Sequence, residues 1–423
     1  MVAEATHQVR RLRNRPSIAL WCGNNEVQAI HQIVQGDLSG TWGEVMFHED
    51  LPAVVAANAP GAIYWPGSPW GEGQDKTVNG IHDGDRHAWE VWHGLDLDVG
   101  DPTVYATRSE AVHFRRYARD NGAFISEFGI HATPELNTLR RWLPESDLVL
   151  RSAGLDHHNK DEPKDKGWVL MSGETGEPTD LAEYIDFSMA CQAEGLKFGV
   201  EHYRRRQPKC SGTFVWQFND PWPGLTWSVI DYDLVPKAGY YFLQRAYRPV
   251  VATFRAESDE LELWVTNAST GSVAIHLDVG LADNTGQLKP IADVEVVSAP
   301  HRSELVWRGP QPDPHLVPWV TDRAGHLEPN RLFLSAIKDL QPRGQVTGTA
   351  RRLSKGRAEI ELTATGYAYL SRVTASSPGI RYSGNYLDLL DGQRAVIELT
   401  NVPDDFDVAT LEVSCFRAPA SPQ

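Results

Sequence analysis

The sequence has few cysteines, no long apolar run and no apolar leader. Its 423 residues include four cysteines, Cys22, Cys191, Cys210 and Cys415, and no pair has the spacing of a metal or redox motif. No apolar run reaches the ~18 residues that a membrane-spanning helix needs, and residues 1–16 lack the apolar core of a signal peptide. We therefore expect neither a disulfide-rich secreted scaffold nor a membrane protein, and we predict a cytoplasmic location.

Positive charge is also scarce. The 40 lysines and arginines are outnumbered by 56 aspartates and glutamates, which gives a net charge of −16. Nucleic acids and anionic membranes attract the opposite sign, so we expect neither as a partner. There is no P-loop, no G-x-S-x-G and no G-x-G-x-x-G after a strand. His82, His87, His93 and His131 have no short ligand spacing, so we predict no metal and no cofactor.

What is present is a globular composition, with 41% hydrophobic and 23% charged residues. Fourteen tryptophans are many for this length. Their flat apolar faces suit ligands such as sugars, although packing in cores and interfaces explains them equally well.

Residues 1–248 alternate strand-like and helix-like segments, which indicates an α/β fold. Short apolar runs ending in polar residues or glycine predict buried parallel strands that begin at Pro16, Ala62, His87, Ala123 and Gly212. Helical patterns cover residues 1–16, 43–58, 107–121, 134–143 and 178–206. Thr133 is the expected N-cap of the helix over 134–143.

From residue 249 the pattern changes to a period of two. Val273, Ile275, Leu277 and Val279 alternate with less apolar residues, as expected of strands with one buried face. Turn signals recur every ten or so residues, which is typical of β-sandwiches. Residues 331–340 look like a strand, and the Pro-Arg-Gly after residue 341 separates two such domains, 249–341 and 342–423.

Two carboxylates stand where predicted strands end. Glu26 follows IALWCGNN, and Glu127 follows AFIS. In α/β barrels the reactive groups lie at this end of the strands. A partly desolvated carboxylate there needs a partner or a task, and two facing one cleft can divide the work of glycoside hydrolysis. The alternative is that each glutamate caps a helix or pairs with an arginine.

Five segments carry a resemblance to a known family. RLRNRPSIALWCGNNE, from Arg11 to Glu26, resembles the acid/base signature of glycoside hydrolase family 2 in its β-mannosidase form, and FISEFG, from Phe124 to Gly129, resembles its nucleophile signature. GDRHAWEVWHG, residues 84–94, looks like the β-mannosidase segment between them. Residues 193–250 are similar to the last barrel helix and strand, and residues 383–393 resemble part of the final β domain.

The resemblance implies a role for several residues. Glu26 would be the general acid/base and Glu127 the nucleophile of a retaining double displacement, for which the carboxyl groups lie ~5–5.5 Å apart. Asn25 would contact the sugar 2-hydroxyl, and its alternative role is to cap the following helix. Trp216 would form an aromatic floor under the sugar. Trp92 and His93 would line the mannose side, although core packing is a competing explanation for these three.

The resemblance implies a multidomain protein of α/β plus all-β type. Residues 1–248 would be strands four to eight of a (β/α)8 TIM barrel, followed by two immunoglobulin-like β-sandwich domains. We expect the first three strands and the N-terminal domains to be absent, and a complementing N-terminal chain or self-association to cover the open sheet.

The predicted function is that of a retaining exo-β-mannosidase acting on β-mannosides or manno-oligosaccharides. Two alternatives stay open. One is another specificity of the family, namely β-galactosidase, β-glucuronidase or exo-glucosaminidase, and the other is a non-catalytic fragment of such an enzyme.

Overall fold

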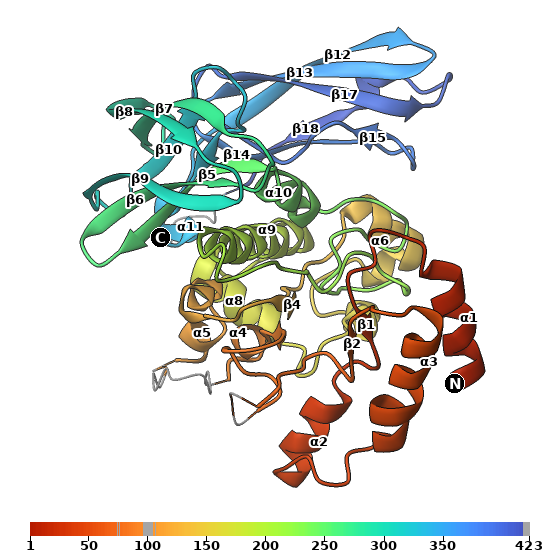
Figure 1. Cartoon of the computed structure of the whole chain (residues 1–423). Helices are drawn as coiled ribbons and strands as arrows, with labels where there is room; N and C mark the ends of the chain where they lie inside the picture. The colour runs from red at the N-terminus through yellow and green to blue at the C-terminus, as the bar shows by residue number, and fades with distance from the viewer. Residues whose placement is uncertain (74, 76, 96–104, 106, 418–423) are drawn as a thin grey trace.

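The computed structural model describes residues 1–73, 75, 77–95, 105 and 107–417. Helices dominate up to residue 248, and antiparallel strands dominate after it. In Figure 1 the strands of the second half gather at one end of the molecule, above the long helix α9 (Leu181–Arg205). Helices α1 (Val2–Leu12), α2 (Val27–Gln35) and α3 (Leu51–Asn58) lie at the opposite end.

The first half contains short parallel strand segments whose polar ends lie close together. Strand β1 (Trp21–Cys22) pairs with β2 (Tyr64–Trp65), and β3 (Arg86–His87) pairs with β4 (Ile125–Glu127). The Asp85 amide donates to the Trp70 carbonyl at 3.1 Å, which joins the two pairs beyond the end of β2. Because parallel strands share one direction, this arrangement brings their carboxyl ends to one edge.

All five expected strands are shorter in the structure than the sequence predicts, and two of them differ further. HAWEVWHG contributes His87 to β3 and then turns into helix α4 (Glu90–His93), because Val91 and Trp92 both turn into the core rather than to alternate faces. The segment after Gly212 forms no regular strand. It follows β4 through isolated contacts, with the Phe214 amide donating to the Ile125 carbonyl at 2.7 Å.

The predicted helices all contain helical structure, but several are divided. The pattern over 43–58 gives a π-helical turn, Met46–Asp50, that continues as α3. The pattern over 107–121 gives α5 (Arg108–Ala111), started by a capping box at Thr107, and a 3-10 turn, Phe114–Arg119. The N-cap prediction of Thr133 is wrong. Helix α6 (Leu136–Trp142) begins two residues later, after Glu135, and the Thr133 hydroxyl bonds the Pro134 carbonyl instead.

The remaining helices of the first half are α7 (Ala153–His158), α8 (Lys166–Glu174) and α10 (Ala238–Ala246), with a 3-10 turn at Glu145–Asp147. Helix α9 is buried along most of its length and supplies the centre of the largest apolar core. Aromatic side chains from the β-rich half join this core, among them Trp319, Tyr369 and Tyr386. No described helix is long and apolar enough to cross a membrane.

The second half forms two pairs of antiparallel sheets. The first pair is β5-β6-β9 and β11-β10-β7-β8, and the second is β12-β13-β17-β15 and β16-β14-β18. The segment 331–340 differs from its strand prediction, because it contributes only the end of β11 and then forms the short helix α11 with Ile337 and Leu340 both buried. The bounds are β5 Val250–Glu257, β6 Glu260–Asn267, β7 Val273–Ala282, β8 Leu288–Ser298, β9 Arg302–Pro310, β10 Val317–Asp322, β11 Asn330–Arg331, α11 Ile337–Leu340, β12 Gln345–Ser354, β13 Gly356–Thr365, β14 Ala368–Thr374, β15 Arg381–Tyr382, β16 Leu387–Leu389, β17 Arg394–Val402, a 3-10 turn Val408–Thr410 and β18 Glu412–Ser414.

Candidate active site

Glu26 and Glu127 meet at one histidine. Nδ1 of His87 lies 2.8 Å from Oε1 of Glu26 and 3.4 Å from Oε2 of Glu127. One nitrogen of His87 and one carboxylate oxygen from each glutamate lie within 4.8 Å of one another. The two carboxylates are 101 positions apart in the sequence, and the parallel strand ends bring them together.

The local backbone conformation explains how each carboxylate is positioned. Glu127 ends β4 and stands opposite His87 in the register of β3 and β4. Glu26 precedes α2 with a left-handed backbone, φ 62°, and its amide donates to the Ser68 carbonyl at 2.7 Å. A non-glycine residue rarely adopts this conformation, and such residues cluster at functional sites.

The two carboxylates have different environments. The Glu127 side chain is 12% exposed and that of Glu26 is 31% exposed. Burial raises the pKa of Glu127, and the charges of Glu26 and Asp85 act in the same direction. His87 and the indole N–H of Trp89, which donates to Oε2 of Glu127 at 3.0 Å, act to lower that pKa.

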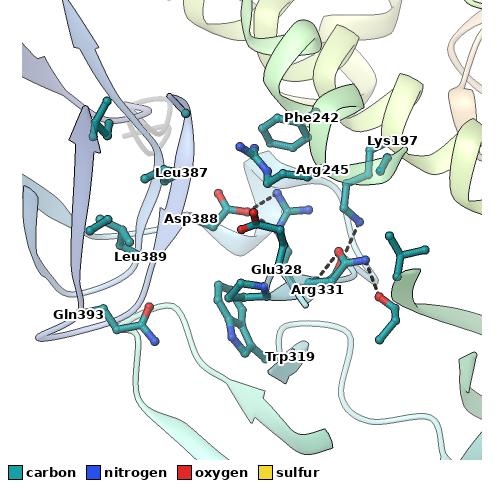
Figure 2. A pocket seen from close by; sticks show the side chains of 18 of the residues that line it. Lys197, Phe242, Arg245, Trp319, Glu328, Arg331, Leu387, Asp388, Leu389 and Gln393 are labelled. Carbon is teal, nitrogen blue, oxygen red and sulfur yellow. Dashed lines mark hydrogen bonds and ion pairs between the residues drawn. The ribbon is translucent and has the colours of Figure 1, made fainter. Parts of the chain in front are cut away.

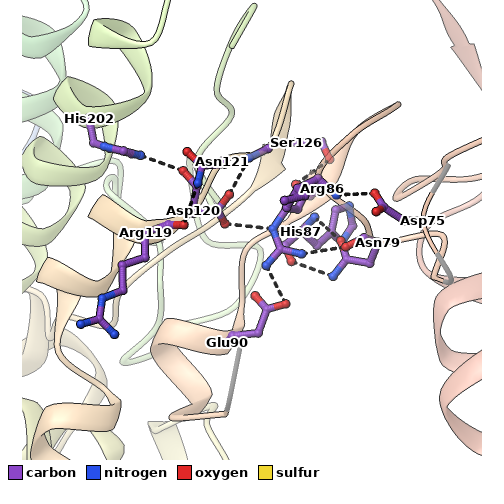
Figure 3. Close-up of polar contacts among 12 residues, drawn as sticks. Asp75, Asn79, Arg86, His87, Glu90, Arg119, Asp120, Asn121, Ser126 and His202 are labelled. Atoms are coloured by element: carbon purple, nitrogen blue, oxygen red, sulfur yellow. Dashed lines mark hydrogen bonds and ion pairs between the residues drawn. The ribbon is translucent and has the colours of Figure 1, made fainter. Parts of the chain in front are cut away.

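A polar network fixes His87 from behind (Figure 3). Its backbone amide and carbonyl both bond the Asn79 side chain, at 2.8 and 3.0 Å. The neighbouring Arg86 is 1% exposed and pairs with Asp120 at 2.9 Å and Glu90 at 2.8 Å. A buried guanidinium with two carboxylate partners anchors this strand end firmly, so the ring of His87 is held in place between the two glutamates.

The other ring nitrogen of His87 contacts Ser68. Nε2 lies 3.0 Å from Oγ of Ser68, which in turn donates to Oδ2 of Asp85 at 2.5 Å. Ser126 donates to the same carboxylate oxygen, also at 2.5 Å. Because the Ser68 proton is directed at Asp85, the Ser68 oxygen is free to accept the Nε2 proton of His87.

Curated relatives resemble this chain over most of its length. Beta-mannosidase B of Aspergillus flavus is 28% identical over 447 aligned residues, which cover 94% of this chain and 50% of that protein. Beta-mannosidase B of Aspergillus niger is 33% identical over 300 residues, which cover 63% of this chain and 33% of that protein. The chain spans about half the length of the curated relatives that it matches over most of its own length. No family model matches it.

Solved structures also resemble this chain over most of its length. The β-D-mannosidase of Dictyoglomus thermophilum matches with a TM-score of 0.84 and 25% identity, over 98% of this chain and 50% of that one. In sequence and in fold this chain is similar to β-mannosidases. The exo-chitosanase CsxA of Amycolatopsis orientalis, at 15% identity and a TM-score of 0.69, shares the fold.

The other residues predicted from the family resemblance occupy different positions around the carboxylates. Asn25 is exposed, and the helix cap that could have explained it comes from Asn24, whose Oδ1 accepts from the Val27 amide at 3.0 Å. Trp216 is 40% exposed and lies beside the segment that carries Glu127, since its amide donates to the Phe128 carbonyl at 2.9 Å. The Trp216–Gln217 peptide is cis.

Trp92 and His93 separate in the structure. Trp92 is fully buried and donates to Oδ2 of Asp161 at 3.2 Å, so it supports the site from behind rather than lining it. His93 is exposed and lies beside Trp89, with ring centroids 6.0 Å apart. Of this pair only His93 has an exposed side chain.

Sequence reasoning missed His87 and Trp89 as functional residues. Both occur in the quoted HAWEVWHG, but as part of an expected strand, where neither stood out. His87 was considered only as a metal ligand. Its contact with Glu26 joins residues 61 positions apart, and that of Trp89 with Glu127 joins residues 38 apart, which no local pattern reports.

Two groups of described residues bring metal-ligand types together. One is the Glu26–His87–Glu127 group, and the other is His276, Asp278 and Asp293 on the surface of β7 and β8. Arg323 donates to both aspartates of the second group, so a cation is already supplied there by the chain. In the first group both carboxylates contact Nδ1 of His87, so a proton can be shared between the histidine and a glutamate. The absence of a metal stays a prediction.

A sizeable cavity in the described part of the chain lies away from the carboxylates. It has a volume of about 540 Å³ and lies between α9, α10 and strands of both β-rich regions (Figure 2). Its charged walls are paired with one another, as Arg331 contacts Glu194 and Asp388, and Lys197 contacts Glu201. Charged side chains that pair with one another in this way hold the helical half and the β-rich regions together. They are not free to act on a ligand, so we place the candidate active site at the two carboxylates.

Proposed function

We propose that this chain carries the catalytic carboxylates of a retaining exo-β-mannosidase, which releases terminal non-reducing β-D-mannose from β-mannosides. The meeting of Glu26 and Glu127 at His87, with oxygens within 4.8 Å, is the observation that supports the proposal most. Retaining enzymes hold their carboxyl groups ~5–5.5 Å apart, whereas inverting enzymes leave ~6.5–9.5 Å for a water molecule.

In the first step Glu127 attacks the anomeric carbon while Glu26 gives its proton to the leaving oxygen. The glycosidic bond breaks, and an ester forms between mannose and Glu127. In the second step Glu26 removes a proton from water, which attacks the same carbon and restores the Glu127 carboxylate. Glu127 needs to be ionised to attack, and the indole N–H of Trp89, which donates to its carboxylate, favours that form.

The contact between His87 and Glu26 explains where the proton that Glu26 donates is held. If Nε2 donates to Ser68, a neutral His87 can only accept at Nδ1, so its 2.8 Å contact with Glu26 requires a proton on the carboxyl group. If Nδ1 carries a proton instead, in the neutral or the charged ring, it donates that proton to Glu26. In both cases one proton lies between Glu26 and His87, ready for the leaving group.

We further propose that residues 1–248 correspond to strands four to eight of a TIM barrel, and that the two sheet pairs are immunoglobulin-like sandwiches. Apolar side chains near the strand segments support a covering partner, because Ile63 is 58% exposed and Phe214 and Phe218 are each 62% exposed. A complementing N-terminal chain is the partner that we propose. Self-association is the alternative.

The same exposed residues support a second candidate, a fragment that does not turn over alone because its sugar pocket is incomplete. Hydrolysis of p-nitrophenyl β-D-mannoside by the purified chain, with Glu127→Ala as control, separates the two. Turnover that the variant loses supports the enzyme. A folded chain without turnover, even after a barrel-completing N-terminal chain is added, would contradict it.

The residue roles need their own test. A 2-fluoro-mannoside with a good leaving group should label Glu127, because it traps the ester and slows its hydrolysis. Labelling of another residue would overturn the nucleophile assignment. Parallel assays with β-galactoside, β-glucuronide and β-glucosaminide separate β-mannosidase from the other specificities of the family.

A further inference from the structure

Lys166 is a buried ammonium group close to the carboxylates, and the reaction steps above do not use it. Its side chain is 4% exposed. Nζ lies 2.8 Å from Oδ1 of Asp161, 2.6 Å from the Glu162 carbonyl and 3.0 Å from Nδ1 of His93. An ammonium group has three N–H bonds and no lone pair. These three acceptors use all of them.

The contact with Lys166 determines which ring nitrogen of His93 carries the proton. An ammonium group can only donate, so Nδ1 of His93 must present a lone pair to Lys166. The ring proton is then on Nε2, and a second proton on Nδ1 would break the contact. The identity of the partner therefore fixes both the tautomer and the charge of His93.

Asp161 keeps Lys166 in this position. The Asp161 side chain is 4% exposed, and its second oxygen accepts from the Trp92 indole at 3.2 Å. The Glu162 amide donates to Oδ1 at 2.8 Å, and the Asp161 amide donates to Asn159. A buried ion pair with its remaining hydrogen bonds satisfied has one arrangement, so the lysine is not free to turn toward a ligand.

His93 connects this pair to the carboxylates. It is the last residue of α4, and its exposed ring lies beside Trp89, which donates to Glu127. The negative charge of Glu26 also acts to raise the pKa of His93. With Nδ1 turned to Lys166, the donor that His93 can offer a ligand is Nε2–H.

We propose that Lys166 and Asp161 are positioning residues that hold His93 as a neutral Nε2–H donor to a sugar hydroxyl, and that they direct the site to neutral sugars rather than uronic acids. The inference has two parts, the tautomer of His93 and its contact with a sugar. The second part, called the sugar half below, rests on the proposed function. Asp161 neutralises the only ammonium group described at His93, so a sugar carboxylate would meet no free cation there. A neutral imidazole bonds a hydroxyl without needing a counter-charge.

The charged groups that face His93 agree with this assignment. Burial lowers its pKa first, and the charge of Lys166 lowers it further, while Asp161 and Glu26 act to raise it. The pKa ends below its usual value. His93 therefore stays neutral at neutral pH and into the acid range, where a free histidine gains a proton.

Long-range nitrogen NMR of the 15N-histidine-labelled chain tests the tautomer without any activity. The His93 signals are assigned by their loss in His93→Gln. We expect an unprotonated Nδ1 and a protonated Nε2 at pH 7. In Lys166→Met we expect the His93 pKa to rise and the tautomers to mix. Lys164→Met is the matched control, because Lys164 is exposed two residues before Lys166 and its ammonium group bonds the backbone carbonyls of Asp156 and Asn159.

Lys166→Met leaves Asp161 buried without its partner and can unfold the loop. The double variant Asp161→Asn with Lys166→Met removes both charges and keeps the test open. A protonated Nδ1 in the parent chain, or an unchanged His93 titration in whichever variant folds, would overturn the inference.

The sugar half is tested on the Glu127→Ala chain, which cannot turn over its ligand. p-Nitrophenyl β-D-mannoside should shift the Nε2 resonance of His93, and p-nitrophenyl β-D-glucuronide should not. A mannoside that shifts other resonances but not His93 overturns the contact while the proposed function stands. If no glycoside binds even after a barrel-completing N-terminal chain is added, although the tautomer is as expected, the proposed function and the sugar half fail together, and the Lys166–His93 pair remains.

Discussion

His87 is the residue that couples the two carboxylates, and its removal is the sharpest test of the site. His87→Phe keeps a ring of comparable size and removes both nitrogen contacts to Glu26 and Glu127. General acid–base catalysis contributes about 10²–10⁴-fold, so we expect kcat on β-mannosides to fall by roughly 100-fold with little change in KM. Steady-state kinetics on an active preparation measure both constants.

His82→Gln is the control for this variant, because His82 lies five positions away, has a 61% exposed side chain and pairs with Asp75 rather than with either glutamate. It should leave both constants unchanged. An equal loss in the two variants, or a His87→Phe chain that raises KM alone, would count against a role in proton transfer.

A second histidine predicts how stability depends on pH. His202 is 8% exposed, Nε2 contacts the Asp120 carbonyl at 2.8 Å, and burial lowers its pKa to about 4. An unfolded histidine titrates near 6.5, so between about pH 4 and 6.5 the unfolded chain binds the extra proton. Stability is therefore complete above about pH 6.5 and falls as the pH drops toward 4, by up to ~3 kcal/mol.

His202→Gln keeps a donor for the Asp120 carbonyl and removes the titration. Urea unfolding at pH 7 and pH 4.5 should show a smaller acid loss in this variant than in the parent chain. His157→Gln, at an exposed position, should keep the parent's pH dependence. An identical acid loss in the parent and in His202→Gln would contradict the assignment.

At the scale of elements, long periodic segments were predictable and short ones were not. Helix α9 was expected over 178–206 and extends over Leu181–Arg205, because its pattern and its caps are local. The segment at His87 was read as one strand, yet it divides into β3 and α4. Two residues of strand carry too little periodicity to define a boundary, and tertiary packing of Val91 and Trp92 decides it.

The same limit applies to the site. Glu26 and Glu127 could be found because each follows an apolar run, which is a local signal. His87, Trp89 and Lys166 matter through contacts between residues 38 to 73 positions apart. Only the folded chain brings these together, so the sequence supplied the carboxylates and not the groups that orient them.

The start of α9 gives a prediction at this scale. Asp180 accepts from the Glu183 amide at 2.8 Å and begins the helix on which both halves of the molecule pack. Loss of an N-cap costs about 1 kcal/mol. Asp180→Ala should lower the free energy of unfolding by about that amount in urea, and Asp180→Asn, which can still cap, should lose less. Equal losses would show that charge, not capping, is what matters here.

At the scale of the whole molecule, one arginine joins three regions. Arg331 on β11 is 2% exposed and contacts Glu194 of α9 at 2.7 Å and Asp388 of β16 at 2.7 Å. It therefore ties the helical half to both β-rich regions, beside the cavity of Figure 2. The Tyr369 hydroxyl also donates to Glu194, at 2.9 Å.

Arg331→Met should be strongly destabilising, because it leaves Glu194 and Asp388 buried without a cation. Breaking one side of a buried ion pair costs ~3–5 kcal/mol, whereas Arg351→Met, which breaks an exposed pair with Glu359, should cost at most about 1 kcal/mol. Calorimetry distinguishes two outcomes. If Arg331 only stabilises, the variant melts in one transition at lower temperature. If it holds the regions together, the β-rich half melts separately, and a parent-like melting curve would contradict both roles.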